Sequence, residues 1–134
     1  MDLCKSNPDV LTVEELLFSA TLFDDANDQL EVYQNTARVH SDDFRGHNNT
    51  GVALMALGRM KQAEEAFNAA KAIAANNGAV NTNLGAIARQ NGDADGAETY
   101  YGKASGGSEL SYNKGVLAIT QGNYGRAISS MGSN

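Results

Sequence analysis

Apolar residues recur along the chain every three or four positions, and short polar stretches rich in glycine, asparagine or aspartate separate the runs. This spacing is typical of amphipathic α-helices, because residues three and four apart share one helix face. We therefore expect an all-helical chain without strands. The pattern predicts helices over 12–23, 26–40, 43–57, 60–75, 78–91, 94–105, 108–121 and 124–132, after a flexible lead-in over 1–9.

Several of these predicted helices begin beside residues that can accept hydrogen bonds from free backbone N–H groups. Thr12 and Glu15 have the spacing of a capping box. Asp24, Asp25 and Asp93 lie where a helix N-terminus favours short acceptors and negative charge. The local sequence therefore supports the helix starts that the apolar pattern predicts.

A fixed series of small and bulky residues repeats along the chain. Two glycines, an alanine, a large side chain and a further alanine follow one another at steps of 7, 5, 4 and 3 residues. The series occurs at Gly51, Gly58, Ala63, Phe67 and Ala70, then at Gly85, Gly92, Ala97, Tyr101 and Ala104, and its first four positions recur at Gly115, Gly122, Ala127 and Met131. The first two copies lie 34 residues apart and the next two lie 30 apart. Such agreement indicates repeated helical hairpins.

Each position of the series has a mechanical meaning. The first glycine lies inside a helix, where glycine costs about 1 kcal/mol relative to alanine, so its recurrence predicts close approach of a neighbouring helix. The second glycine suits the left-handed residue that ends a helix. The alanine allows two helices to cross closely, and the large side chain fills the core on the same face. Because one hairpin cannot bury both faces, each needs another stacked upon it.

These residues make the chain similar to the tetratricopeptide repeat family, whose unit is 34 residues long. The family pattern has small residues at its eighth and twentieth positions, a glycine at the fifteenth and a bulky residue at the twenty-fourth. It matches 44–77 throughout, 78–107 with a deletion, and 108–134 in part, while 10–43 is a degenerate copy. The resemblance implies an all-α, right-handed superhelical solenoid of antiparallel helix hairpins over 10–134.

The chain also departs from the family pattern. The family's leucine at the seventh position is kept as Leu84 but is replaced by Thr50 and Lys114. The last hairpin is incomplete, and no polar capping helix follows it, although such arrays usually need one. We therefore expect an excised segment of a longer protein, or an open C-terminal end that a second chain covers.

Charge is unevenly distributed along the 134 residues, whose net charge is −6. Residues 1–43 hold ten acids and two bases, whereas residues 44–134 hold six acids and eight bases. The overall acidity argues against a nucleic-acid partner, which requires a basic patch. The acidic N-terminal part either attracts a basic partner or forms solvated helix faces.

The chain offers little for chemistry. Cys4 is the single cysteine, and His40 and His47 have no cysteine or aspartate at metal-ligand spacing. No cluster of acid, base and nucleophile is present, and the glycines lack the lysine of a phosphate loop. No run of 18 apolar residues occurs. We therefore expect no catalytic residues, no metal, no cofactor and no direct membrane insertion.

The resemblance implies a concave groove lined by the first helix of each hairpin, which binds a protein or peptide. The side chains expected to line it are Asn48, Asn49, Val52, Met55, Asn83, Arg89, Tyr112, Asn113 and Val116. Asn49, Asn83 and Asn113 occupy the same slot in three hairpins. Their amides either bond an extended peptide backbone or bond their own neighbours, and both alternatives stay open.

Two functions follow from these observations. The first is a non-catalytic scaffold that binds a peptide or helix of a partner in the concave groove. The alternative is a structural spacer or self-assembly module within a longer protein, associating through the open C-terminal end. The asparagine- and glycine-rich composition is similar to tetratricopeptide segments of bacterial envelope proteins, and the compartment stays open between bacterial envelope or periplasm and cytoplasm.

Overall fold

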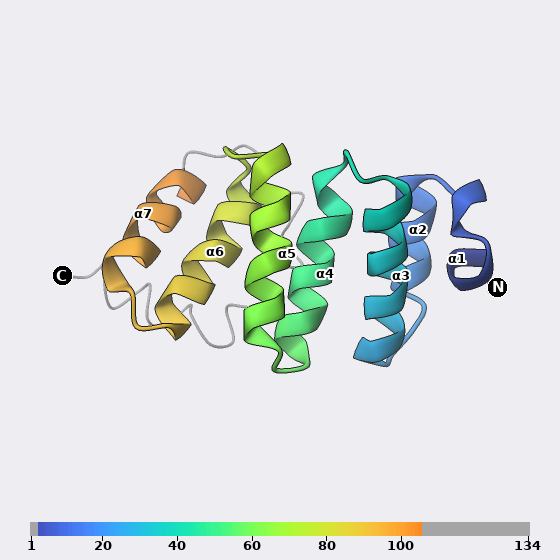
Figure 1. Cartoon of the computed structure of the whole chain (residues 1–134), viewed down its shortest axis with the longest axis horizontal. Helices are drawn as coiled ribbons and strands as arrows, with labels where there is room; N and C mark the ends of the chain where they lie inside the picture. The colour runs from blue at the N-terminus through green and yellow to red at the C-terminus, as the bar shows by residue number, and fades with distance from the viewer. Residues whose placement is uncertain (1–2, 106–134) are drawn as a thin grey trace. The chain divides into compact units, whose positions relative to one another are not determined.

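The computed structural model describes residues 3–105, and every regular element within them is a helix (Figure 1). The elements are α1 (Leu3–Ser6), the 3-10 helix η1 (Pro8–Val10), α2 (Val13–Ala20), α3 (Ala26–Val39), α4 (Phe44–Ala56), α5 (Met60–Ile73), α6 (Gly78–Gln90) and α7 (Ala94–Ser105). The predicted all-α class is confirmed, and α2 to α7 agree with six predicted helices to within a few residues. The helices expected over 108–121 and 124–132 lie outside the described residues.

The chain divides into two compact units. The first is Met1–Ala75 and the second begins at Asn76. In the first unit each long helix packs against the one before it: α3 against α2, α4 against α3, and α5 against α4 (Figure 1). In the second unit α6 packs against α7. This packing between successive helices is what stacked hairpins produce.

The helix starts are capped as the sequence predicts. The side chain of Thr12 accepts a hydrogen bond from the backbone N–H of Glu15 at 3.1 Å, and the carboxylate of Glu15 accepts one from the backbone N–H of Thr12 at 2.9 Å. Asp25 caps α3, and Asp93 accepts from the backbone N–H of Gly96 at 2.9 Å. These bonds satisfy N–H groups that have no partner inside the helix.

Two helices end at a glycine in the left-handed conformation. Gly58 has a φ of 78° and Gly92 a φ of 80°. After the first glycine, the N–H of Arg59 donates to the carbonyl of Leu54 at 2.9 Å, and the residue after Gly92 makes the equivalent bond at 2.8 Å. This bond pattern satisfies the last carbonyls of α4 and α6. The predicted role of the second glycine of the series is therefore confirmed.

The first glycine of the series makes room for an aromatic ring. A Cβ atom added to Gly51 would lie 2.6 Å from Cδ1 of Phe67, and one added to Gly85 would lie 2.6 Å from Cε1 of Tyr101. In both hairpins the ring belongs to the second helix and the glycine to the first. Phe67 is fully buried, whereas Tyr101 is partly exposed. The predicted close approach is confirmed within each hairpin.

The segment expected to be a flexible lead-in, 1–9, contains helical residues that the sequence pattern did not predict. Within the described part of that segment, α1 and η1 are helical, and Cys4 is buried against Leu16, Ala20 and Val32. The carbonyl of Cys4 accepts a hydrogen bond from the amide of Asn35 at 3.0 Å. The sequence pattern missed α1 because four residues make about one helical turn, which is too short to show a periodicity.

Candidate functional site

The structure places six of the expected groove residues, three of them in buried positions. On α4, Asn48 and Val52 are buried, while Asn49 and Met55 are partly exposed. On α6, in the second unit, Asn83 is buried and Arg89 is partly exposed. The remaining three, Tyr112, Asn113 and Val116, lie outside the described residues.

Asn49 and Asn83 occupy equivalent positions in α4 and α6, and in both the side-chain oxygen Oδ1 is enclosed and accepts no hydrogen bond within the described part of the chain. The two residues differ in exposure: Asn49 is partly exposed, whereas Asn83 is fully buried and takes part in another interaction. An enclosed carbonyl oxygen without a donor costs free energy, and of these two residues only Asn49 has a side chain that also reaches the surface.

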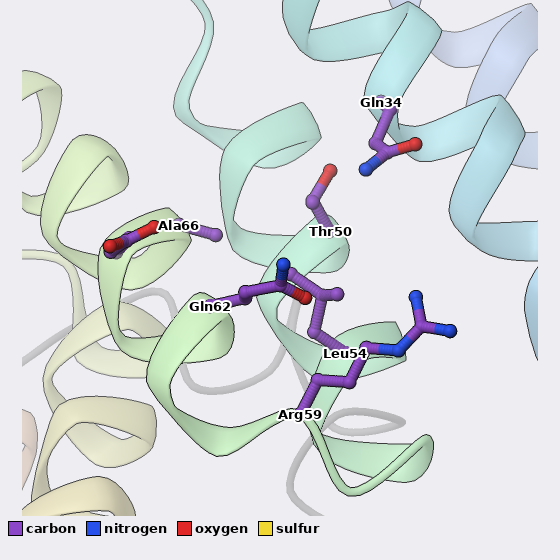
Figure 2. Close-up of a pocket in the computed structure, with 7 residues that line it drawn as sticks. Gln34, Thr50, Leu54, Arg59, Gln62 and Ala66 are labelled. Atoms are coloured by element: carbon purple, nitrogen blue, oxygen red, sulfur yellow. The ribbon is translucent and has the colours of Figure 1, made fainter.

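The first unit also contains a groove that the sequence did not predict. It has a volume of about 400 Å³ and lies between α3 and α5, above α4 (Figure 2). Its lining residues come from three helices and the turn between α4 and α5: Gln34, Thr50, Leu54, Arg59, Gln62, Glu65 and Ala66.

The groove has a partly apolar floor and polar walls. Thr50 and Leu54, four residues apart on α4, are both buried and form the floor. The hydroxyl of Thr50 donates to the carbonyl of Gly46 at 2.7 Å. Figure 2 shows Gln34 and Gln62 reaching from opposite sides toward the space over this floor.

A departure from the family pattern accounts for the space above α4. Thr50 occupies the seventh position of its repeat, where the family has a leucine. Threonine is smaller than leucine, so the interval between α3 and α5 is less completely filled. This substitution was visible in the sequence and could have indicated the groove. The sequence alone, however, does not show which neighbouring side chains surround the shortened one.

The charged residues of the first unit separate into paired and unpaired groups. Arg45 contacts Asp43 at 2.7 Å and Glu14 at 3.1 Å, and these ion pairs join the first turns of α2 and α4. In contrast, Arg59 and Glu65 at the groove form no ion pair with any residue in 3–105. Their charges remain available to a ligand.

Arg45 also changes the titration of its partners. Its side-chain hydrogen bond lowers the pKa of Asp43 below the ordinary value, although partial burial opposes this effect. The pKa of Glu14 is lowered first by backbone hydrogen bonding and then by Arg45. Both shifts stabilise the ionised carboxylates, which keeps the ion pairs formed at neutral pH.

Most of the N-terminal acids considered for a basic partner have intramolecular roles. Glu14 pairs with Arg45, and Asp28 pairs with Lys5 at 2.7 Å. Glu15 and Asp25 cap helices. Capping and ion pairing inside the fold therefore give these four acids a role, and the alternative of a basic partner stays a hypothesis.

The described residues contain few groups suited to metal or acid–base chemistry. Within 3–105, no three histidine, cysteine, aspartate or glutamate side chains lie together so as to hold a metal ion. Nε2 of His40 lies 2.8 Å from the carbonyl oxygen of Leu11, and Nε2 of His47 lies 3.3 Å from that of Ser41. In the same part of the chain, no helix is both long and apolar enough to cross a membrane.

Helical hairpins with repeated packing positions place the chain among the α-helical repeat proteins. Residues 23–79, which include α3, α4 and α5, match the family model of the tetratricopeptide repeat. This segment therefore belongs to the tetratricopeptide repeat family, as its glycine and alanine spacing predicted. No curated protein matches the chain. Repeats of this family generally mediate protein–protein interaction and are typically non-catalytic.

Proposed function

We propose that the chain is a non-catalytic scaffold that binds a peptide or helix of a partner protein on the face of α4 that carries Asn49 and Met55. The observation that carries this proposal is the enclosed Oδ1 of Asn49, which accepts no hydrogen bond within the described residues. Because the Asn49 side chain is partly exposed, a rotation about its side-chain bonds brings this oxygen to a backbone N–H of an extended peptide, and its amide nitrogen can donate in return.

The neighbouring side chains support a role in binding. Met55 is partly exposed six residues after Asn49, and Val52 lies between them at a spacing that continues one helix face. A methionine adapts its shape to different apolar side chains, which suits a surface that accepts a peptide. The proposal extends to Asn83 and Arg89 of α6 and, beyond the described residues, to Tyr112, Asn113 and Val116.

Asn49→Ala tests the proposal. Peptides selected from a random library for binding to the full chain serve as probes, with Kd measured by fluorescence anisotropy. Loss of one well-enclosed hydrogen bond should raise Kd by about fivefold or more, since such bonds contribute about 1–3 kcal/mol. Because no ion pair is involved, Kd should change little with salt. Asn68→Ala, at an exposed asparagine of α5, is the matched control.

Two outcomes would contradict the scaffold at this face. One is that the selected peptides bind Asn49→Ala and Met55→Ala with the same Kd as wild type. The other is a Kd that rises equally in the Asn68→Ala control, which would indicate a general effect on stability. Far-ultraviolet circular dichroism of each variant shows whether the helices are retained.

Self-association is a second candidate function, and exposed apolar residues at the C-terminal end of α2 and just after it favour it. Phe18 and Leu22 are 66% and 54% exposed and lie four residues apart. Contact between two such surfaces removes apolar area from water. Sedimentation velocity over a range of concentrations measures this directly. A sedimentation coefficient that rises with concentration, and no longer rises in Phe18→Ser, supports assembly through α2, whereas a constant monomer value contradicts it.

A further inference from the structure

The groove above Thr50 and Leu54 lies on a different side of α4 from the proposed Asn49 surface. Successive residues of an α-helix turn by about 100° around the axis. Thr50 and Leu54 therefore share one direction, while Asn49, Val52 and Met55 point about 120–180° away from it. Ligands of the two surfaces can consequently be distinguished by the α4 residues that they affect.

The walls of the groove offer the chemistry that a peptide backbone requires. Gln34 and Gln62 are exposed amides on facing helices, and each carries a carbonyl acceptor and an NH₂ donor. An extended peptide presents N–H and C=O groups to both sides and can bond to both walls. Leu54 on the floor is apolar and buried, and it suits contact with one apolar side chain of the peptide.

Arg59 and Glu65 add a charge pattern to this groove. Six residues separate them along α5, which corresponds to about 9 Å along the helix axis. Three residues of a polyproline II segment span about 9 Å, and side chains three positions apart lie on the same side of it. Neither side chain is ion-paired within the part of the chain described here. A ligand carrying only negative charge would be repelled by Glu65, and one carrying only positive charge by Arg59.

We infer that this groove is a second peptide-binding surface, and that its occupant is a segment in the polyproline II conformation with an acidic and a basic side chain about three residues apart. The acidic side chain binds Arg59, the basic side chain binds Glu65, and an apolar side chain between them contacts Leu54. That the occupant is a peptide rests on the proposed scaffold function, whereas the surface and its charge pattern are independent of Asn49.

Blocked decapeptides with a glycine–serine background test this inference. One carries the order aspartate, leucine, glycine, lysine, a second carries lysine, leucine, glycine, aspartate, and a third has asparagine and glutamine in place of the charged residues. Each is titrated into the full ¹⁵N-labelled chain. One charged order should shift the backbone amides of Thr50, Leu54 and Gln62, and the neutral peptide should shift them less at the same concentration.

Charge reversals then identify the contacts. Arg59→Glu should raise the Kd of the binding peptide by about fivefold or more, because an attractive pair becomes a repulsive one. Lys61→Glu, which makes the same charge change on an exposed residue of α5 outside the groove lining, should change Kd less than about twofold. In Arg59→Glu/Glu65→Arg, the preference should move to the opposite peptide order.

A third variant fills the groove without disturbing its charges. Thr50→Leu restores the residue of the family pattern, and leucine has a higher helix propensity than threonine. The variant should therefore lose peptide binding while its melting temperature stays equal or rises. If it fails to fold, the reversals at the exposed Arg59 and Lys61 still decide the question.

Three results would overturn the inference. The first is the absence of shifts at Thr50, Leu54 and Gln62 with both charged peptides. The second is an equal effect of Arg59→Glu and Lys61→Glu, which would indicate general electrostatics. The third is a set of amide shifts confined to Asn49 and Met55. That result would contradict binding in this groove but agree with the proposed function. Conversely, if the Kd is unchanged in Asn49→Ala but rises in Arg59→Glu, only the proposed Asn49 surface is contradicted.

Discussion

Gly51 and Gly85 show how a single missing side chain determines the packing of a hairpin. Each lies in the first helix of its hairpin, beneath an aromatic ring of the second helix. Glycine is unfavourable inside a helix, yet a Cβ atom at either position would collide with the ring. Their recurrence in the sequence therefore reflects a steric requirement of the packed hairpin rather than a local preference of the backbone.

The loss of stability caused by an alanine at each of these glycines should depend on how far the opposing ring can move. Gly51→Ala should lower the free energy of unfolding by about 1–3 kcal/mol, because Phe67 is fully buried and cannot move away without disturbing the core. Gly85→Ala should cost less, since the partly exposed Tyr101 has room to shift. Urea unfolding followed by circular dichroism measures both.

Gly102→Ala is the control for these substitutions. Gly102 lies within α7, and a Cβ atom there would meet nothing within 4 Å. Its replacement should leave the chain as stable or stabilise it by up to about 1 kcal/mol through helix propensity. If Gly51→Ala changed the free energy of unfolding no more than Gly102→Ala does, contact with the Phe67 ring would not explain why residue 51 is a glycine.

At the scale of helices, Arg45 connects elements that are not consecutive in the chain. It lies in the first turn of α4, pairs with the capping residue Asp43, and reaches Glu14 in the first turn of α2. The capping bond and the ion pair share the carboxylate of Asp43. Their contribution to stability therefore depends on the protonation of that group.

This connection predicts a pH dependence with a defined sign. The pKa of Asp43 in the folded chain lies below its ordinary value of 3.8, so its ionised form stabilises the fold above that value. The stabilisation is lost as pH falls through the lowered pKa. Between about pH 5 and about pH 2, the melting temperature should therefore fall further in wild type than in Arg45→Met.

Arg38→Met is a suitable control for the pH series. Arg38 lies 3.9 Å from Asp9, and both side chains are mostly exposed, so this pair should contribute little. The variant should show the same pH dependence as wild type. If melting temperatures of Arg45→Met and wild type ran parallel through the acidic range, Asp43 would not contribute through Arg45.

At the scale of the whole molecule, packing in the first unit runs from each long helix to the one that follows. α2, α3, α4 and α5 are joined by such contacts within Met1–Ala75. In a repeat architecture, stability arises from individual repeats and from interfaces between neighbours. A fragment containing complete hairpins can therefore keep most of its stabilising contacts.

Residues 1–75 alone should fold into helices with a cooperative thermal transition. The fragment 1–56 should be much less helical, because it lacks α5 and hence Phe67, the ring that packs on Gly51. Circular dichroism of both fragments checks this expectation. An unstructured 1–75 fragment, under conditions where the full chain is helical, would show that the first unit depends on the residues after it.

Features that involve only a few consecutive residues were determined by the sequence itself. The capping box at Thr12 and the left-handed Gly58 and Gly92 follow from the hydrogen-bonding needs of helix ends, which are local. The repeat series was equally readable, because periodic packing requires small and bulky residues at fixed spacings. These features sufficed to predict the all-α class and the tetratricopeptide resemblance.

The enclosure of side chains was decided only by the tertiary structure. Asn48 and Asn83 were expected in an open groove, yet both are buried, while the surroundings of Asn49 leave its oxygen without a donor in the described residues. The hollow at Thr50 depends on side chains from three successive helices, and its lining residues are up to 32 positions apart in the sequence. A local pattern shows that a residue is small or polar, but the free space and hydrogen-bond partners around it are supplied by other helices.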